Sequence, residues 1–221
     1  MTAVTALAST MLTMLANVSS IPVDDLANWT EAVYRGIPPN RVTVENGALR
    51  IAVKNSSSPL IYRFDQPLRL TGFSVEATWS GELKIPAGVT QGEDGADDFV
   101  LKVGLIVAGD RTLGWFQRRV AADWILRLYE LAPEGSGIEG VRFYSTTRQL
   151  DLLGASRAHP LSDLFYEERI THLADSGPFS LSKSFSDPVE TLGLWISSDG
   201  DDTTSELEVK IHRILLKIAD R

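Results

Sequence analysis

The stretch Phe99-Val100-Leu101-Lys102-Val103-Gly104-Leu105-Ile106-Val107 decides the fold class of this chain. Every odd position in it is apolar. Alternation with a period of two is the pattern of a β-strand that buries one face. A shift of the pairing by one residue would move all of these side chains to solvent, so the register of this strand is well specified.

The same alternation recurs on both sides of this strand, over residues 49–53, 60–64, 73–79, 179–185, 192–196 and 207–211. Two windows, 118–131 and 162–173, instead show apolar residues at helical spacing. Strands that follow one another without regular βαβ alternation are typical of sandwiches. The sequence therefore predicts a mainly β protein, an antiparallel β-sandwich of jelly-roll type with one or two peripheral helices.

The N-terminal segment, residues 1–23, contains no charged side chain. Its apolar residues Val4, Leu7, Met11, Met14 and Val18 are spaced three and four apart, as on one face of an amphipathic helix. A packing helix is one interpretation, and the remnant of an export signal is the other. Threonines make the segment too polar for a transmembrane helix. Residues 24–221 contain no convincing linker and are predicted to form a single sandwich domain.

Composition excludes several classes of function. The 221 residues include no cysteine, so thiol nucleophiles, zinc–thiolate sites and iron–sulfur clusters are excluded. The 21 Lys and Arg against 29 Asp and Glu give a net charge of −8, without the basic footprint that nucleic-acid binding needs. No membrane insertion is expected. A chain of this size can fold without a metal or disulfide, so no cofactor is required for stability.

Two acidic strings are candidate sites. The loop Asp199-Gly200-Asp201-Asp202 concentrates carboxylate oxygens, which are the ligands that Ca²⁺ prefers, so Asp199, Asp201 and Asp202 are candidate metal ligands. Asp-Gly is also a hairpin signal, and a simple turn is the alternative. Asp97 and Asp98 lead into the central strand. If the sheet places them beside the late loop, the two acidic groups converge; otherwise a solvated loop is the simpler interpretation.

Aromatic and basic residues supply further candidates. Trp195 is out of phase with Leu194 and Ile196, so it faces the opposite side of its strand. Trp115 lies in a short segment rich in polar residues, whereas Trp79 and Trp124 are in phase with apolar neighbours and are predicted to pack in the core. Arg118 and Arg142 could bind an anionic group, although pairing with carboxylates of the same chain is the alternative.

Three motifs resemble those of a bacterial envelope family known as a domain of unknown function. They are the Asp-Asp pair that opens a strand, a Trp and Arg cluster before an aromatic strand, and a late strand followed by an Asp-x-Asp-Asn-Thr loop. In this chain they read Asp97-Asp98-Phe99, Trp115 with Arg118 and Arg119, Val141-Arg142-Phe143-Tyr144-Ser145, and Gly193 through Thr203, with Asp202 where the family has Asn. The likeness runs from about Trp29 to Leu216. It implies a jelly-roll sandwich similar to carbohydrate-binding modules, usually exported.

The leading functional hypothesis is a non-catalytic binding module for carbohydrate or another envelope polymer. Its predicted ligand residues are Asp97, Asp98, Trp115, Arg118, Arg142, Tyr144 and Trp195, with Ca²⁺ as a candidate structural ion at Asp199, Asp201 and Asp202. One alternative is a glycan-cleaving enzyme that uses Asp98 with Asp199 or Asp201 as paired carboxylates. Another is a structural or interaction protein of the envelope. A periplasmic or envelope location is expected, a cytoplasmic one stays open, and the oligomeric state is not predicted.

Overall fold

The computed structural model describes residues 17–159 and 162–220, and almost all of their regular structure is strand. The strands pair in the order β3-β4-β11-β5-β10-β6-β7-β9-β8, with β1 on β11 and β2 on β5. Two short helices, α1 (Trp115–Val120) and α2 (Asp123–Tyr129), and the 3-10 turn Leu150–Leu152 complete the fold. The strands are β1 (Asn17–Ile21), β2 (Trp29–Glu31), β3 (Arg41–Glu45), β4 (Ala48–Lys54), β5 (Leu60–Glu82), β6 (Lys102–Gly109), β7 (Gly137–Thr147), β8 (Ser156–His159), β9 (Ser162–His172), β10 (Gly177–Ser197) and β11 (Glu206–Ile218).

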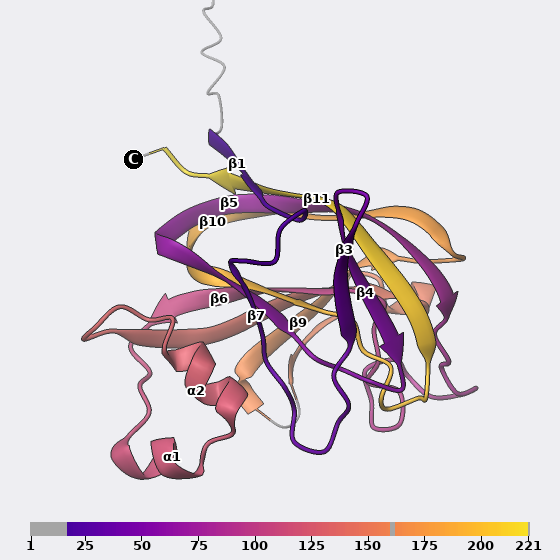
Figure 1. The fold of residues 1–221 in the computed structure, drawn as a ribbon, viewed down its shortest axis with the longest axis horizontal. Helices are drawn as coiled ribbons and strands as arrows, with labels where there is room; N and C mark the ends of the chain where they lie inside the picture. Colours follow the sequence, from indigo (N-terminus) through magenta and orange to yellow (C-terminus); the bar gives the residue numbers. More distant parts are fainter. Residues whose placement is uncertain (1–16, 160–161, 221) are drawn as a thin grey trace, which may run out of the picture.

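The paired strands fold over into two layers because β5 and β10 are long enough to run through both (Figure 1). Residues 68–82 of β5 pair with β11 and with the first half of β10, whereas residues 60–63 pair with residues 193–196 of β10, next to β6. The pairing between β5 and β10 is interrupted after Ser184 and resumes at Val189. Pro188 lies in this interruption, and Pro67 lies in a second one, between the pairs Thr191–Leu68 and Gly193–Arg63. Proline cannot donate a ladder hydrogen bond. The prolines therefore fall where the sheet turns from one layer to the other.

We call the layer that contains β3, β4 and β11 the upper layer, and the layer that contains β6, β7 and β9 the lower layer. The main core lies between them. Leu101, Val103 and Leu105, the odd residues of the central strand, are fully buried there against Val75 and Val209 of the upper layer. The alternation read from the sequence thus points the expected side chains inward, and the predicted β-sandwich with peripheral helices is confirmed.

The outer face of the lower layer carries a second apolar cluster. Ile106, Phe143 and Trp195 belong to it, and Leu128 of α2 packs against them. In Figure 1, α2 lies directly beneath the lower layer and α1 lies farther out. The lower layer therefore has side chains packed on both faces, and its outer face is the one that carries the site described below.

Two local predictions differ from the structure. The helix predicted over residues 162–173 is wrong: these residues form β9, which runs parallel to β7 and antiparallel to β8, so the sandwich is not purely antiparallel. Pairing on both edges outweighs the helical spacing of a few apolar residues. The helix predicted over 118–131 occurs as α1 and α2, two helices rather than one.

The helix predicted near the N-terminus falls mostly on residues outside the described part of the chain. Its described end, Asn17–Ile21, is strand β1 paired with β11, so the helix does not extend there. Within the described residues, no helix is long and apolar enough to cross a membrane.

Candidate functional site

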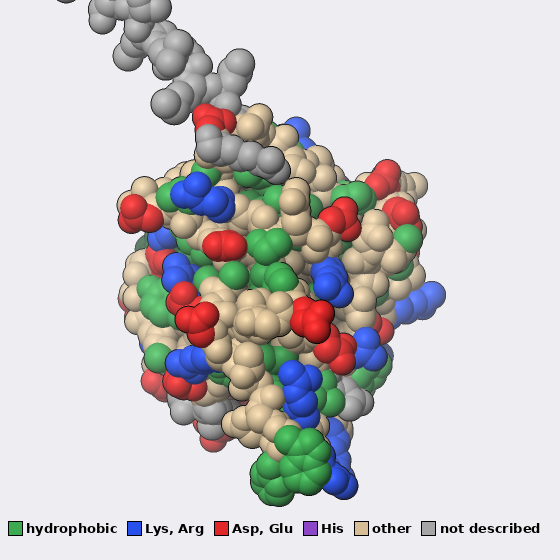
Figure 2. Space-filling model, turned by 90° about the vertical axis from the view of Figure 1, so that its left-hand side faces the viewer, with side chains coloured by type: hydrophobic (Ala, Val, Ile, Leu, Met, Phe, Trp, Pro, Cys, Tyr) green, Lys and Arg blue, Asp and Glu red, His purple; other side chains and the backbone are tan. Residues whose placement is uncertain are grey.

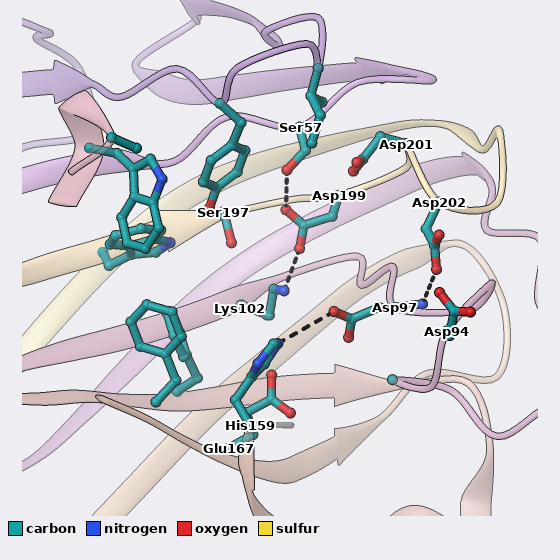
Figure 3. A pocket seen from close by; sticks show the side chains of 18 of the residues that line it. Ser57, Asp94, Asp97, Lys102, His159, Glu167, Ser197, Asp199, Asp201 and Asp202 are labelled. Carbon is teal, nitrogen blue, oxygen red and sulfur yellow. Dashed lines mark hydrogen bonds and ion pairs between the residues drawn. The ribbon is translucent and has the colours of Figure 1, made fainter. Parts of the chain in front are cut away.

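A cavity of about 730 Å³ opens on the outer face of the lower layer. Its floor comes from β6, β7, β9 and β10 through Lys102, Phe143, Glu167 and Trp195. Its rim comes from α2 and from the loops that follow β2, precede β6 and follow β10. Figure 3 shows that the rings gather on one side of the cavity and the carboxylates on the other. The cavity therefore has an aromatic wall and a polar wall.

The aromatic wall consists of five rings, most of whose contacts are edge to face. Trp195 at its base makes T-shaped contacts with Trp124 and with Phe143, at interplanar angles of 88° and 83°. Tyr34 meets Trp124 at 83°. The fifth ring, Phe165, contacts both Trp124 and Phe143. Near-perpendicular rings in contact form the sides of an apolar box rather than a single flat platform.

A glycine on the cavity face of β6 makes room for this wall. A Cβ atom on Gly104 would lie 2.8 Å from the ring of Phe143 and equally close to a methyl of Val141, which is too short for any side chain. The position alternates with the inward-facing Val103 and Leu105, so it lies on the outer face of β6, beneath the Phe143 ring. The absence of a side chain at residue 104 therefore lets the Phe143 ring cover β6.

The polar wall forms because the two acidic strings lie side by side. The backbone N–H of Asp97 donates to Oδ2 of Asp202 at 2.8 Å. In the opposite direction, the N–H groups of Asp202 and Thr203 donate to the carboxylate of Asp98 at 3.2 and 2.7 Å, and the Thr203 hydroxyl donates at 2.6 Å. The convergence that the sequence left conditional therefore occurs.

Asp98 supports this wall from behind. Its side chain is 0% exposed, and both of its oxygens accept hydrogen bonds from the late loop. Burial raises the pKa of Asp98, while the bonds from Thr203 and Asp202 oppose that shift. Asp98 thus positions the loop and does not line the cavity.

Asp199 lies at the base of the polar wall and is paired. Its Oδ2 is 2.8 Å from the ammonium of Lys102, and its Oδ1 accepts a hydrogen bond from Ser57 at 2.8 Å (Figure 3). Burial opposes the charge on Lys102, but Asp199, Asp97 and Glu167 together raise the pKa of this ammonium. Lys102 is therefore held in its charged form inside the cavity.

Asp201 differs from its neighbours because it has no cationic partner. Among the described residues, no Lys, Arg or His nitrogen lies within ion-pair distance of its carboxylate. Burial and the negative charges of Asp199 and Asp98 raise the pKa of Asp201 to about 6. The cavity thus contains a carboxylate that costs free energy to ionise.

Among the described residues, only one group of three carboxylate or imidazole side chains is close enough to share a metal ion. It consists of Asp97, His159 and Glu167, whose donor atoms all lie within 4.8 Å of one another. This group already has cationic neighbours. Arg157 and Arg169 pair with Glu167 at 2.8 and 3.2 Å, and Arg157 also approaches Asp97. A metal ion would have to compete with both guanidinium groups.

The predicted Ca²⁺ ligands do not gather in this way. Asp199 turns toward Lys102 and Ser57, Asp202 accepts from the backbone of Asp97, and Asp201 lies apart from both contacts. Each carboxylate of the loop therefore has a different environment, and a Ca²⁺ ion at Asp199, Asp201 and Asp202 stays a prediction.

The structure places Asp97, Trp195, Asp199, Asp201 and Asp202 in the cavity lining. The other predicted ligand residues lie elsewhere. Arg142 on β7 pairs with Glu139 at 2.9 Å. Tyr144 is buried in the main core against Phe73, at a ring-centroid distance of 5.4 Å, because it lies on the inner face of β7. Asp98, described above, is buried behind the loop.

Trp115 and Arg118 lie on α1, outside the cavity lining. Trp115 is 73% exposed and, with Phe116 and Val120, makes α1 an apolar tip. Figure 2 shows this protruding group of hydrophobic side chains flanked by basic ones. Arg119 stacks on the Trp115 ring at 5.0 Å. Their role in binding stays a prediction.

Sequence reasoning missed most of the aromatic wall. Tyr34, Phe143 and Phe165 come from three segments that only the fold brings together, and Trp124 was predicted to pack in the core. One signal was available: Lys102 occupies an even position in the central strand, so it had to lie on the face opposite the main core.

No protein-family model and no curated protein matches this chain. Solved structures do resemble it in fold. A family 11 carbohydrate-binding module from Clostridium thermocellum, in complex with a β-1,3-1,4-mixed-linked tetrasaccharide, shares 8% identity over 92% of this chain and 98% of its own, with a TM-score of 0.43. The xylan-binding module CBM15 shares 10% over 93% and 99%, with a TM-score of 0.38. The lumenal domain of VIP36, in a Ca²⁺/Man3GlcNAc-bound form, shares 10% over 91% and 89%, with a TM-score of 0.40. These likenesses extend no further than the fold.

Proposed function

We propose that the protein is a non-catalytic carbohydrate-binding module whose ligand occupies the cavity on the lower layer. The observation that supports this most directly is the division of the cavity into an aromatic wall and a polar wall. A sugar ring has apolar C–H faces and hydroxyl edges, so it can pack against Trp124 while its hydroxyls meet Asp97 and Asp201. Binding sites are commonly apolar cavities with a few well-placed polar groups, in the range of 300–1,000 Å³.

The state of the carboxylates favours binding over hydrolysis. Glycosidases use two carboxyl groups about 5–10 Å apart that both reach the substrate. Asp98 is fully buried, and Asp199 is held by Lys102 and Ser57. Of the acids named for the glycan-cleaving alternative, Asp98 and Asp199 are thus occupied in holding the loop and the ion pair, so Asp201 has neither of them as a second carboxylate free to reach a substrate. An envelope or periplasmic location stays a prediction that accompanies this function.

Isothermal titration calorimetry with a panel of neutral and charged oligosaccharides tests the proposal. At least one of them should bind, and Trp124→Ala should weaken that binding by roughly tenfold, since loss of an aromatic contact costs about 1–2 kcal/mol. Tyr166→Ala is the matched control, because Tyr166 is an exposed ring on β9 outside the cavity lining. Absence of binding across the panel would reject the function, and release of shorter sugars from a bound oligosaccharide would favour the enzyme.

A further inference from the structure

The lining of the cavity is strongly acidic. Six of its residues are Asp or Glu, whereas two are Lys or Arg: Lys102 and the exposed Arg35. Arg157 and Arg169 lie behind this lining and pair with Glu167. Even with these two guanidinium groups included, the carboxylates exceed the Lys and Arg side chains by two, and His159 beside Asp97 is the remaining basic group of the lining. A ligand that enters the cavity therefore meets an uncompensated negative field.

The excess is concentrated at the late loop. Asp201 lacks a cationic partner among the described residues, and its pKa is raised by burial and by the charges of Asp199 and Asp98. Asp199 is neutralised by its ion pair with Lys102, so Asp201 carries the uncompensated charge of the loop. A positively charged N–H donor beside Asp201 would relieve this repulsion.

The opposite wall suits the same charge. The Trp124 ring stands nearly perpendicular to the rings of Tyr34 and Trp195, so a group beside them meets ring faces from more than one direction. Ring faces carry negative electrostatic potential, and sets of aromatic rings are used to bind ammonium groups. Both walls therefore favour a cation, whereas a neutral sugar can hydrogen-bond to the carboxylates but leaves their negative charge uncompensated.

We infer that the ligand of this cavity is an amino sugar whose amine is free and positively charged, held between the aromatic wall and the carboxylate of Asp201. The inference rests on the proposed carbohydrate-binding function and narrows it to a cationic class. N-acetylation of the amine removes its charge and leaves the sugar ring unchanged. The acetylated and free forms of one oligosaccharide are therefore a matched pair of probes.

Calorimetry at pH 7 with three β-1,4-linked tetramers separates the two claims: glucosamine, N-acetylglucosamine and glucose. The glucosamine tetramer should bind roughly tenfold more tightly than the other two, as a cation–π contact and a partly exposed ion pair together allow. Equal or tighter binding of a neutral tetramer would overturn the inference and leave the proposed function standing. Absence of binding by all three would also overturn the inference, and absence of binding across the wider panel would reject the proposed function as well.

Asp201→Asn provides an internal test on the protein side. It should lower affinity for the glucosamine tetramer by about fivefold and leave affinity for a neutral tetramer within twofold, because the amide keeps hydrogen-bonding capacity but loses the charge. Asp65→Asn is the charge-matched control, since Asp65 is exposed and outside the cavity lining. Equal loss for charged and neutral tetramers in Asp201→Asn would contradict recognition of the amine.

Discussion

Replacing Asp201 by asparagine should stabilise the protein at neutral pH, although it removes a residue from the proposed binding site. The pKa of this carboxyl is raised from its ordinary value of 3.8 to about 6 because burial, Asp199 and Asp98 all disfavour its charge. Each pKa unit corresponds to about 1.4 kcal/mol, which sets an upper limit of about 3 kcal/mol for the cost of ionisation. Because Asp201 is partly exposed to solvent, we expect Asp201→Asn to recover about 1 kcal/mol.

The stability gained by Asp201→Asn should depend on pH, because the cost of ionising Asp201 does. Below about pH 4 the carboxyl is protonated in both the folded and the unfolded chain, so it costs nothing. As pH rises from about 4 to about 6 the folded state holds a proton that the unfolded state has lost, and the free energy of unfolding falls with pH. Above about pH 6 the cost is constant. The stability advantage of the asparagine variant should therefore be absent near pH 4 and fully developed by pH 7.

Urea unfolding of the wild type, Asp201→Asn and Asp65→Asn between pH 4 and pH 8 measures this difference directly. Only the midpoint should move in Asp201→Asn, with an unchanged m-value, since neither substitution alters the surface exposed on unfolding. A destabilised Asp201→Asn variant, or a gain that is the same at pH 4 and pH 7, would refute the electrostatic reasoning. A gain in stability together with weaker amine binding is the trade-off expected of a residue kept for function.

Other substitutions test the supports of the site. Asp98→Ala should destabilise the protein by about 3 kcal/mol in urea titrations, since it leaves the buried donors of Thr203 and the loop backbone unsatisfied; a loss below about 1 kcal/mol would argue against this support. Lys102→Met should cost about 3–5 kcal/mol by leaving Asp199 buried and unpaired, and Lys102→Met combined with Asp199→Asn should restore part of it; a double variant no more stable than the single one would contradict the pairing. Trp115→Ala should leave oligosaccharide affinity within twofold because α1 lies outside the cavity lining, and a larger loss in calorimetry would extend the binding surface to α1.

The alternation in the chain predicted much of the fold because it is a local property. Leu101, Val103 and Leu105 point into the core as their spacing requires. The alternation also predicted that Trp195 faces away from the side of its strand that carries Leu194. The structure places Trp195 on the outer face of the lower layer, where the cavity lies. The prediction for the segment 162–173 failed because its apolar spacing is compatible with a helix, while its parallel pairing with β7 is a tertiary contact that leaves no local signal.

The candidate site followed from the sequence only in part. The two clusters of acidic residues could be recognised in the sequence. Which of their side chains faces the cavity, Asp201 or Asp98, depends on hydrogen bonds between loops about 100 residues apart. Tyr144 illustrates the same limit. Its motif suggested a ligand residue, yet the register of β7 against β6 turns it into the core and turns Phe143 outward.

The sequence by itself determined the sandwich, the absence of thiol chemistry, the acidic balance and the two loops in which carboxylates concentrate. These depend on composition and on residues a few positions apart. The tertiary structure alone decided that the loops meet, that Asp98 is buried while Asp201 lines the cavity, and that five rings from separate segments face them. The physical reason is that burial and charge pairing are properties of neighbours in space, which the chain acquires only when β5 and β10 fold the sheet into two layers.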